Sequence, residues 1–274
     1  MMDDADVEAL EIQLVLDAIH ARYGFDLRSY AWSSIRRRVL AAFAKSGLPN
    51  LGEFQHRLLT DAAFFSDVLN ALTVCVTEPF RDPGFFRVFR ESMVPILRTY
   101  PELRIWHSGC STGEEAYACA IVLEEEGLYD RAQIYATDLN QRALDQAKQG
   151  MYAAEQLHVL RENYRSAGGT RSVGQYYTEA YEHFAVRDSL KRNLLFFQHD
   201  LVSDQPFAHV HVIFCRNVLI YFNPDLRAAV IDKMVGSLCS GGFLCLGAGE
   251  TLPREAAGVL TEFAAGERVY RHAR

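Results

Sequence analysis

The stretch Arg104-Ile-Trp-His-Ser-Gly-Cys-Ser-Thr-Gly-Glu-Glu-Ala-Tyr117 places a turn of small residues between a short apolar run and the start of a helix. Junctions from a strand into a helix are where open α/β sheets bind nucleotide-like ligands. The two glycines of the turn permit backbone angles denied to other residues and let a ligand approach the main chain. Ser111 or Thr112 is expected to cap a helix running through residues 116–126. The alternative is a purely structural connection.

The charged residues around this turn indicate which class of ligand it can bind. No Lys follows the second glycine, so a P-loop for a triphosphate is not expected. Glu114 and Glu115 would repel a pyrophosphate at the helix N-terminus. Two carboxylates there suit a ligand with an ammonium group instead, and the amino-acid end of S-adenosylmethionine (SAM) carries one.

A second strand-like run, Gln133-Ile-Tyr-Ala-Thr-Asp138, ends in an acid. Its distance from the glycine turn is the one at which nucleotide folds place a ribose-binding carboxylate. Asp138 is therefore expected to bind the two ribose hydroxyls. The alternative is that Asp138 caps a helix over residues 141–148.

Apolar runs alternate with helical stretches through the second part of the chain. The runs lie at Ile105, at 134–136, at 194–197, at 210–214 and at 243–246. This alternation predicts an α/β fold with a mostly parallel sheet covered on both faces. Each run ends in polar or small residues, and we expect these five ends to surround one crevice.

Residues 151–192 interrupt the alternation. They contain few long apolar runs, and the segment Tyr176–Val186 alternates in polarity. A small antiparallel β excursion is predicted there, because a simple connection would be shorter.

The first seventy residues are helical in pattern, with four apolar stripes and a break at Ser46-Gly-Leu-Pro-Asn50. Residues 3–26 hold seven acids and one Arg, whereas residues 28–57 hold six basic residues and one acid. A small helical module with one basic face is predicted. Arg36-Arg-Arg38 is either a solvated surface or a guide for an acidic partner.

Composition limits the remaining possibilities. The chain has 274 residues, of which 49% are hydrophobic, so one or two domains can each form a core. The net charge of −7 argues against nonspecific nucleic-acid binding. No apolar run is long enough to insert in a membrane, and the acidic start lacks a secretory signal, so a cytoplasmic chain is expected. We expect a monomer.

The six cysteines form no Cys-x-x-C pair and no zinc-type spacing with histidine. They are expected to be free thiols in apolar surroundings. His209 and His211 share a strand face, which is either a metal site or a half-buried face. No metal is expected for function.

Seven short motifs match one family together. They are Tyr23-Gly-Phe-Asp-Leu27, Thr77-Glu-Pro-Phe-Arg81, Gly109-Cys-Ser-Thr-Gly-Glu-Glu115, Ala136-Thr-Asp138, Asp200-Leu201, Cys215-Arg-Asn-Val-Leu-Ile-Tyr-Phe222 and Gly247-Ala-Gly-Glu250. The chain resembles the CheR-type chemotaxis receptor methyltransferases from about residue 7 to 272. The string 215–222 is the most specific match, since an Arg-Asn pair between apolar runs is hard to explain as packing.

The resemblance implies an all-α domain over 1–72, a linker over 73–90 and a Rossmann-like SAM-dependent methyltransferase domain over 91–274. A small antiparallel β-subdomain would be inserted at about 151–192. Family members are protein-glutamate O-methyltransferases. They move the SAM methyl group to glutamates on the cytoplasmic helical domain of chemoreceptors, forming glutamyl methyl esters and S-adenosylhomocysteine (SAH).

The resemblance also implies site residues. Those expected at the cofactor are Cys75, Thr77, Arg81, Gly109, Glu115, Asp138, Asp200, Leu201, Arg216 and Asn217. Arg81 and Tyr221 are the expected catalytic residues. Cys75 stands where the family commonly has Asn, and a thiol cannot offer an amide donor and acceptor together.

Alternatives remain for three of these residues. Arg81 can orient the acceptor carboxylate or form a salt bridge between linker and domain. Tyr221 can help orient the acceptor or belong to the core. Asn217 can bind the amino-acid end of SAM or cap the following helix. For the whole protein, the alternatives are a SAM-binding regulator without turnover and a small-molecule methyltransferase.

Overall fold

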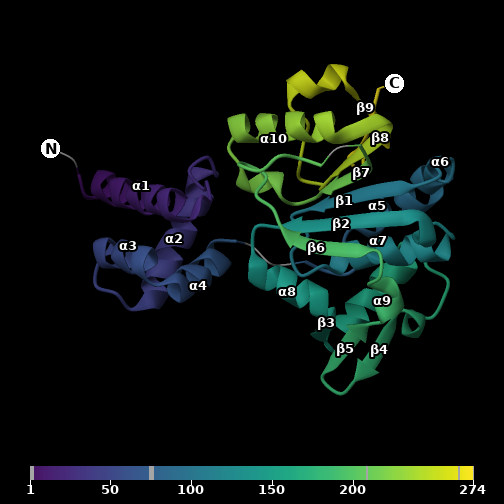
Figure 1. Cartoon of the computed structure of the whole chain (residues 1–274), viewed down its shortest axis with the longest axis horizontal. Coiled ribbons are helices and arrows are strands. Elements are labelled where there is room, and N and C mark those ends of the chain that lie inside the picture. The colour runs from purple at the N-terminus through teal and green to yellow at the C-terminus, as the bar shows by residue number, and fades with distance from the viewer. Residues whose placement is uncertain (1–2, 74–76, 208, 265, 274) are drawn as a thin grey trace.

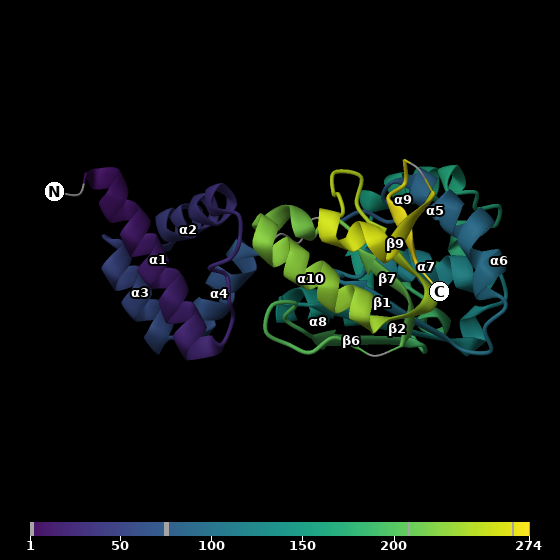
Figure 2. The same cartoon turned by 90° about the horizontal axis from the view of Figure 1, so that it is seen from above.

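The computed structural model describes residues 3–73, 77–207, 209–264 and 266–273. A helical domain lies beside a larger α/β domain, as the sequence predicts (Figure 1). Figure 2 shows the helical domain at one end of the α/β domain, next to α8 (Gln141–Gln149) and α10 (Pro224–Ser237).

The helical domain consists of α1 (Asp4–Tyr23), α2 (Trp32–Ser46), α3 (Leu51–Thr60) and α4 (Ala62–Leu72). Side-chain caps set three of the helix starts: the side chains of Asp3, Asn50 and Asp61 accept from backbone N–H groups at the beginning of α1, α3 and α4. Gly24 ends α1 with a φ of 82°, which glycine adopts without strain. The apolar stripes pack together into a core of their own.

The α/β domain is built on a seven-stranded sheet of order β6-β2-β1-β7-β8-β10-β9. The five predicted strands are confirmed as β1 (Leu103–Ser108), β2 (Ala132–Asp138), β6 (Leu194–Gln198), β7 (Val210–Cys215) and β8 (Leu238–Leu246), all paired in parallel. Two strands that were not predicted, β9 (Leu260–Ala264) and β10 (Val269–His272), extend the sheet in antiparallel fashion.

Helices cover both faces of this sheet. On one face α7 (Glu114–Glu125), α8 and the aromatic residues of α5 (Pro83–Val88) share a large core with the strands. On the other face α10 packs on β7 and β8 in a second core. Figure 1 shows α10 above the sheet and α7 and α8 below it. The helices thus leave the carboxyl ends of the strands facing the helical domain.

The inserted segment forms a three-stranded antiparallel sheet of order β3-β5-β4. Its strands are β3 (Met151–Ala153), β4 (Tyr177–Ala180) and β5 (His183–Val186), so the alternating segment is a hairpin. The insertion also contains a helix that the sequence analysis did not predict, α9 (Gln156–Ser166).

The stretch expected to be a linker, residues 73–90, extends into the α/β domain. Phe85, Phe86 and Phe89 are fully buried in its large core. The helical path continues through a π-helical turn (Phe89–Met93) into α6 (Val94–Leu97). The part that joins the domains therefore ends near Asp82. Among the described residues no helix is long and apolar enough to cross a membrane.

Two sets of contacts join the domains. Backbone N–H groups of Ala31 and Asn223 donate across the boundary to the carbonyls of Tyr221 (2.8 Å) and Ser29 (3.0 Å). Elsewhere, Asn140 Nδ2 donates to Asn70 Oδ1 and Thr73 Oγ1, both at 2.8 Å, and Arg142 pairs with Asp67 at 2.6 Å. These contacts flank the cleft at the strand ends.

Candidate functional site

Two adjoining hollows of about 630 and 540 Å³ lie at the carboxyl ends of the parallel strands. They share Gly109, Asn217 and Tyr221. The larger hollow is otherwise lined by Tyr30, Arg38, Thr73, Asp138, Leu139, His199, Asp200, Leu201, Val218 and Phe222. The smaller hollow is otherwise lined by Thr77, Arg81, Cys110, Ser111, Glu115, Arg216 and Ile220. Every predicted site residue lines one of the two except Cys75, which lies outside the described residues.

The turn after β1 contributes to both hollows: Gly109 lines both, and Cys110 and Ser111 line the smaller one. Gly109 has a φ of 72°, and an added Cβ would lie 2.5 Å from Val218 Cγ2. Gly113, with a φ of 92°, is the N-cap of α7 and no side chain caps that helix. The expectation that Ser111 or Thr112 caps it is wrong, because the Thr112 hydroxyl donates to the Glu114 side chain at 2.7 Å instead.

Asp138 ends β2 with its carboxylate in the larger hollow. Its Oδ2 accepts from Ser111 N at 2.8 Å and its Oδ1 from Asn140 N at 2.9 Å. Burial raises its pKa, and these N–H groups offset part of the rise. Asn140, not Asp138, caps α8, so the capping alternative for Asp138 is wrong. Its carboxylate is left to face the hollow.

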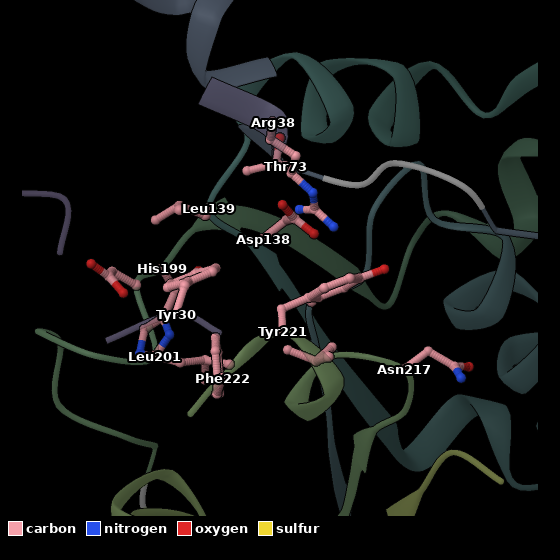
Figure 3. Close-up of a pocket in the computed structure, with 13 residues that line it drawn as sticks. Tyr30, Arg38, Thr73, Asp138, Leu139, His199, Leu201, Asn217, Tyr221 and Phe222 are labelled. Atoms are coloured by element: carbon pink, nitrogen blue, oxygen red, sulfur yellow. The ribbon is translucent and has the colours of Figure 1, made fainter. Parts of the chain in front are cut away.

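His199 and Asp200 follow β6 and line the larger hollow. Figure 3 shows His199 there beside Leu201 and Tyr30. Asp200 accepts from Val202 N at 2.8 Å and from the Ser203 hydroxyl at 3.1 Å, which fixes the turn. His199 Nε2 bonds the carbonyl of Gln205 at 3.1 Å, so this nitrogen carries the proton. The hollow therefore combines an ordered turn with apolar walls from Leu201 and Phe222.

The two glutamates at the start of α7 have different positions. Glu115 reaches the smaller hollow, where Oε2 accepts from Arg216 Nη1 at 2.6 Å and Oε1 lies 3.3 Å from His107 Nδ1. Burial acts to raise its pKa, but the Arg216 charge and the His107 hydrogen bond outweigh it and the pKa is lowered. Glu114 is buried beside Thr112, and burial raises its pKa to about 7. Only one of the two expected carboxylates therefore faces the site.

Arg216 joins the connecting segment to the α/β domain. Its Nη2 pairs with Asp82 at 2.6 Å, its Nη1 bonds Glu115, and its guanidinium lies 4.2 Å from the centre of the Phe85 ring. The salt bridge between the linker and the domain, which was the alternative role for Arg81, is thus made by Arg216. The Arg81 side chain forms no ion pair within the described part of the chain, and its carbonyl accepts from Arg216 at 3.3 Å.

Asn217 is held by its backbone. Its N–H donates to Glu250 Oε2 at 2.9 Å, and its φ of 62° is unusual for a residue other than glycine. The helix that follows is capped by Asn223, so the capping alternative for Asn217 is wrong. Its side chain lines both hollows.

The helical domain supplies residues that the sequence analysis did not assign to the site. Arg38 lies with its guanidinium 4.5 Å from the centre of the Tyr221 ring and donates to the carbonyl of Leu72 at 2.7 Å. Figure 3 shows Arg38 reaching toward Tyr221. Tyr30 packs edge-on against Phe222 at 5.1 Å, and burial, together with the Asp200 and Asp138 carboxylates, raises its pKa. The sequence pattern does not predict a site role for either residue, because only the packing of the two domains brings them to the cleft.

Several residues around the cleft have strained backbone angles. Of the seven residues other than glycine that have a positive φ in the described part, four lie in or beside the lining, namely Phe80, Asp82, Ser111 and Asn217. Such angles cost free energy and persist only where the surroundings enforce them, which is common at functional sites.

Comparisons with known proteins identify the family of the chain. Residues 75–265 match the CheR methyltransferase SAM-binding domain, and residues 10–73 match the CheR methyltransferase all-alpha domain. The chain is 44% identical over 243 residues to Cher3 of Pseudomonas putida, covering 89% of each chain. It is 30% identical to the chemotaxis protein methyltransferase of Listeria innocua, covering 84% of this chain and 85% of that one. It is 31% identical to chemotaxis protein methyltransferase 1 of Vibrio cholerae, covering 80% of each.

The chain belongs to the CheR methyltransferase family, and its cofactor is SAM. The cleft has the chemistry for this ligand. A buried carboxylate faces the larger hollow at Asp138, acidic Glu115 lies at the smaller one, and none of the described residues lining either hollow is a lysine. The buried Ser111 hydroxyl oxygen has no hydrogen-bond partner among the residues described, which leaves a polar group for a ligand.

Proposed function

We propose that this member of the CheR family transfers the methyl group of SAM to glutamate side chains of chemoreceptors in chemotaxis or a related chemosensory pathway. The products are glutamyl methyl esters and SAH. The family and the names of its chemotaxis relatives support the class of reaction. The proposed partner is the cytoplasmic helical domain of methyl-accepting receptors.

One observation carries the proposal: Arg81 and Tyr221 line the same hollow as the residues expected at the amino-acid end of the cofactor. Arg81 has no carboxylate partner among the described residues, so its planar fork is available for an acceptor carboxylate. The Tyr221 ring lies against the Arg38 guanidinium, and its hydroxyl would help to orient that acceptor.

The cofactor residues divide between the two hollows. In the larger one Asp138 would bind the ribose hydroxyls, while Asp200 and Leu201 would lie at the adenine. In the smaller one Thr77, Glu115, Arg216 and Asn217 would hold the amino-acid end. When bound, SAM supplies a methyl group on a sulfonium, which is electrophilic without further activation.

No general base is required of the chain. A glutamate side chain is ionised near neutral pH, so its lone pair is already available. The work of the protein is to align donor and acceptor and to exclude water. The apolar walls at Leu201, Ile220 and Phe222 serve the second purpose.

Transfer of tritiated methyl from SAM to receptor-containing membranes tests the proposal, with alkaline release of methanol as the mark of an ester. Label in a receptor band that is released by alkali supports it. SAH binding without any label would indicate a regulator without turnover. Label confined to small molecules would indicate a small-molecule methyltransferase.

The cofactor assignment makes its own prediction for Asp138. Asp138→Ala should weaken SAH binding at least about tenfold, because one lost charge-assisted hydrogen bond costs roughly 1.5–3 kcal/mol. Titration calorimetry measures this. Asn50→Ala is the control, since it removes the side-chain cap of α3 in the helical domain, lines neither hollow and should cost stability alone. Wild-type affinity in Asp138→Ala would remove that residue from the site.

A further inference from the structure

The inserted β-subdomain contacts the cofactor turn directly through one side chain. Tyr152, in the middle of β3, donates from its hydroxyl to the carbonyl of Thr112 at 2.8 Å. Thr112 lies between the two glycines of the turn. The hydrogen bond spans 40 residues of sequence and is buried, with Tyr152 only 3% exposed.

The other anchors of this turn come from β2 and α7. Cys110 N donates to the carbonyl of Thr137 at 2.8 Å, and Ser111 N donates to Asp138. The Thr112 hydroxyl donates to Glu114. The turn is therefore held from the main sheet, from its own helix and from the subdomain, and Ser111 within it has a strained φ of 51°. A strained turn needs such support to keep one conformation.

Neighbouring residues fix the position of Tyr152. Gly150, with a φ of 62°, turns the chain from α8 into β3, and an added Cβ would lie 3.1 Å from the Tyr117 hydroxyl. The Tyr152 ring then packs against Phe184 of β5 at 5.6 Å. The hydroxyl is thus carried by the sheet of the subdomain as a whole and not by a mobile loop.

We propose that Tyr152 is a positioning residue: it holds the cofactor turn in the binding conformation and couples the order of the β-subdomain to occupancy of the cofactor site. The inference rests on the proposed placement of SAM at this turn. Coupling is reciprocal, so cofactor binding must also stabilise the β3-β5-β4 sheet.

The test compares two buried tyrosine hydroxyls that each donate to a backbone carbonyl. Tyr152→Phe removes the bond to the turn. Tyr129→Phe removes a bond to the carbonyl of Leu190, 2.5 Å away, and a longer one from Asn193 N at 3.4 Å, neither of which involves the turn. Both variants should lose similar unfolding free energy in urea. Only Tyr152→Phe should weaken SAH binding in titration calorimetry, by about fivefold or more.

Hydrogen exchange adds a measurement that would not change if Tyr152 had only a structural role. SAH should slow amide exchange in β3 and β5 of the wild type and of Tyr129→Phe, and much less in Tyr152→Phe at saturating SAH. Wild-type affinity and wild-type protection in Tyr152→Phe would overturn the inference. If Asp138→Ala also binds SAH like the wild type, the placement of the site fails and the inference fails with it.

Discussion

Arg81 is the residue whose substitution gives the most specific prediction about catalysis. Arg81→Ala should keep a folded protein that binds SAH, yet lose at least about tenfold in methyl transfer, equivalent to roughly 1.4 kcal/mol in the transition state. Its fork can hold both oxygens of an acceptor, whereas an ammonium offers one unoriented charge, so Arg81→Lys should recover little. Single-turnover transfer with SAM prebound measures the effect. A normal rate for Arg81→Ala would leave Tyr221 as the first remaining candidate for orienting the acceptor.

Glu114 predicts a pH dependence of stability. Burial raises its pKa from 4.5 to about 7. A folded-state pKa above the unfolded one contributes stability below pH 4.5 that is lost as the pH rises toward 7, on the order of 3 kcal/mol. Glu114→Gln cannot ionise, so it should be more stable than the wild type at pH 8 and nearly equal at pH 4.5.

Urea unfolding at the two pH values measures this difference. Glu124→Gln, a change at an exposed position of the same helix, is the control and should show the wild-type pH dependence. The same pH dependence in Glu114→Gln would show that this carboxyl does not control the change.

Some individual residues could be assigned from the sequence and others could not. The acid ending β2 and the turn after β1 follow from the position of strand ends, so Asp138 and Gly109 were predictable. Which of two adjacent glutamates faces the cleft depends on one 100° step around α7, and the turn before it sets that phase. Tyr30 and Arg38 reach the site only through domain packing.

At the scale of elements, the parallel strands were predictable because each is a short apolar run buried on both faces. The strands β9 and β10 are partly exposed and antiparallel, and their pattern is weaker. The helix α9 carries only two fully buried side chains, Leu160 and Tyr164, so its periodicity is faint. Pairing across a sheet, not local pattern, determines such elements.

The loop after β7 is an element organised by one buried carboxylate. Glu250 is 2% exposed and accepts from the N–H groups of Asn217 (2.9 Å), Leu219 (2.7 Å), Ile220 (3.3 Å) and Gly247 (2.6 Å). Glu250→Gln replaces one acceptor oxygen by an NH₂ group that faces N–H donors. It should lower both stability, by roughly 1–3 kcal/mol, and SAH affinity.

Urea unfolding and titration calorimetry test this on the same samples. Glu255→Gln, at an exposed position five residues later, is the control and should leave both quantities unchanged. Destabilisation with wild-type SAH affinity would mean that the loop keeps its conformation without the Glu250 carboxylate.

At the scale of the whole molecule, the structure divides the basic cluster of α2 that the sequence suggested as a docking surface. Arg36 pairs with Glu8 at 2.5 Å. Arg38 turns inward to Tyr221. Arg37 is exposed and, unlike Arg36 and Arg38, it has no partner among the residues described. The chain carries a net charge of −7, so an acidic partner is repelled at long range and local positive charge must guide the encounter.

Arg37→Glu should therefore slow capture of receptor about threefold to tenfold at low ionic strength, and the difference should shrink in high salt, because exposed charges are screened within a Debye length. SAH affinity should not change, since Arg37 lines neither hollow. Stopped-flow association with receptor fragments measures the rate. Lys148→Glu makes the same charge change on an exposed position of α8 and isolates the effect of net charge. Equal slowing by both variants would mean that the overall charge, not the face of α2, controls the approach of the receptor.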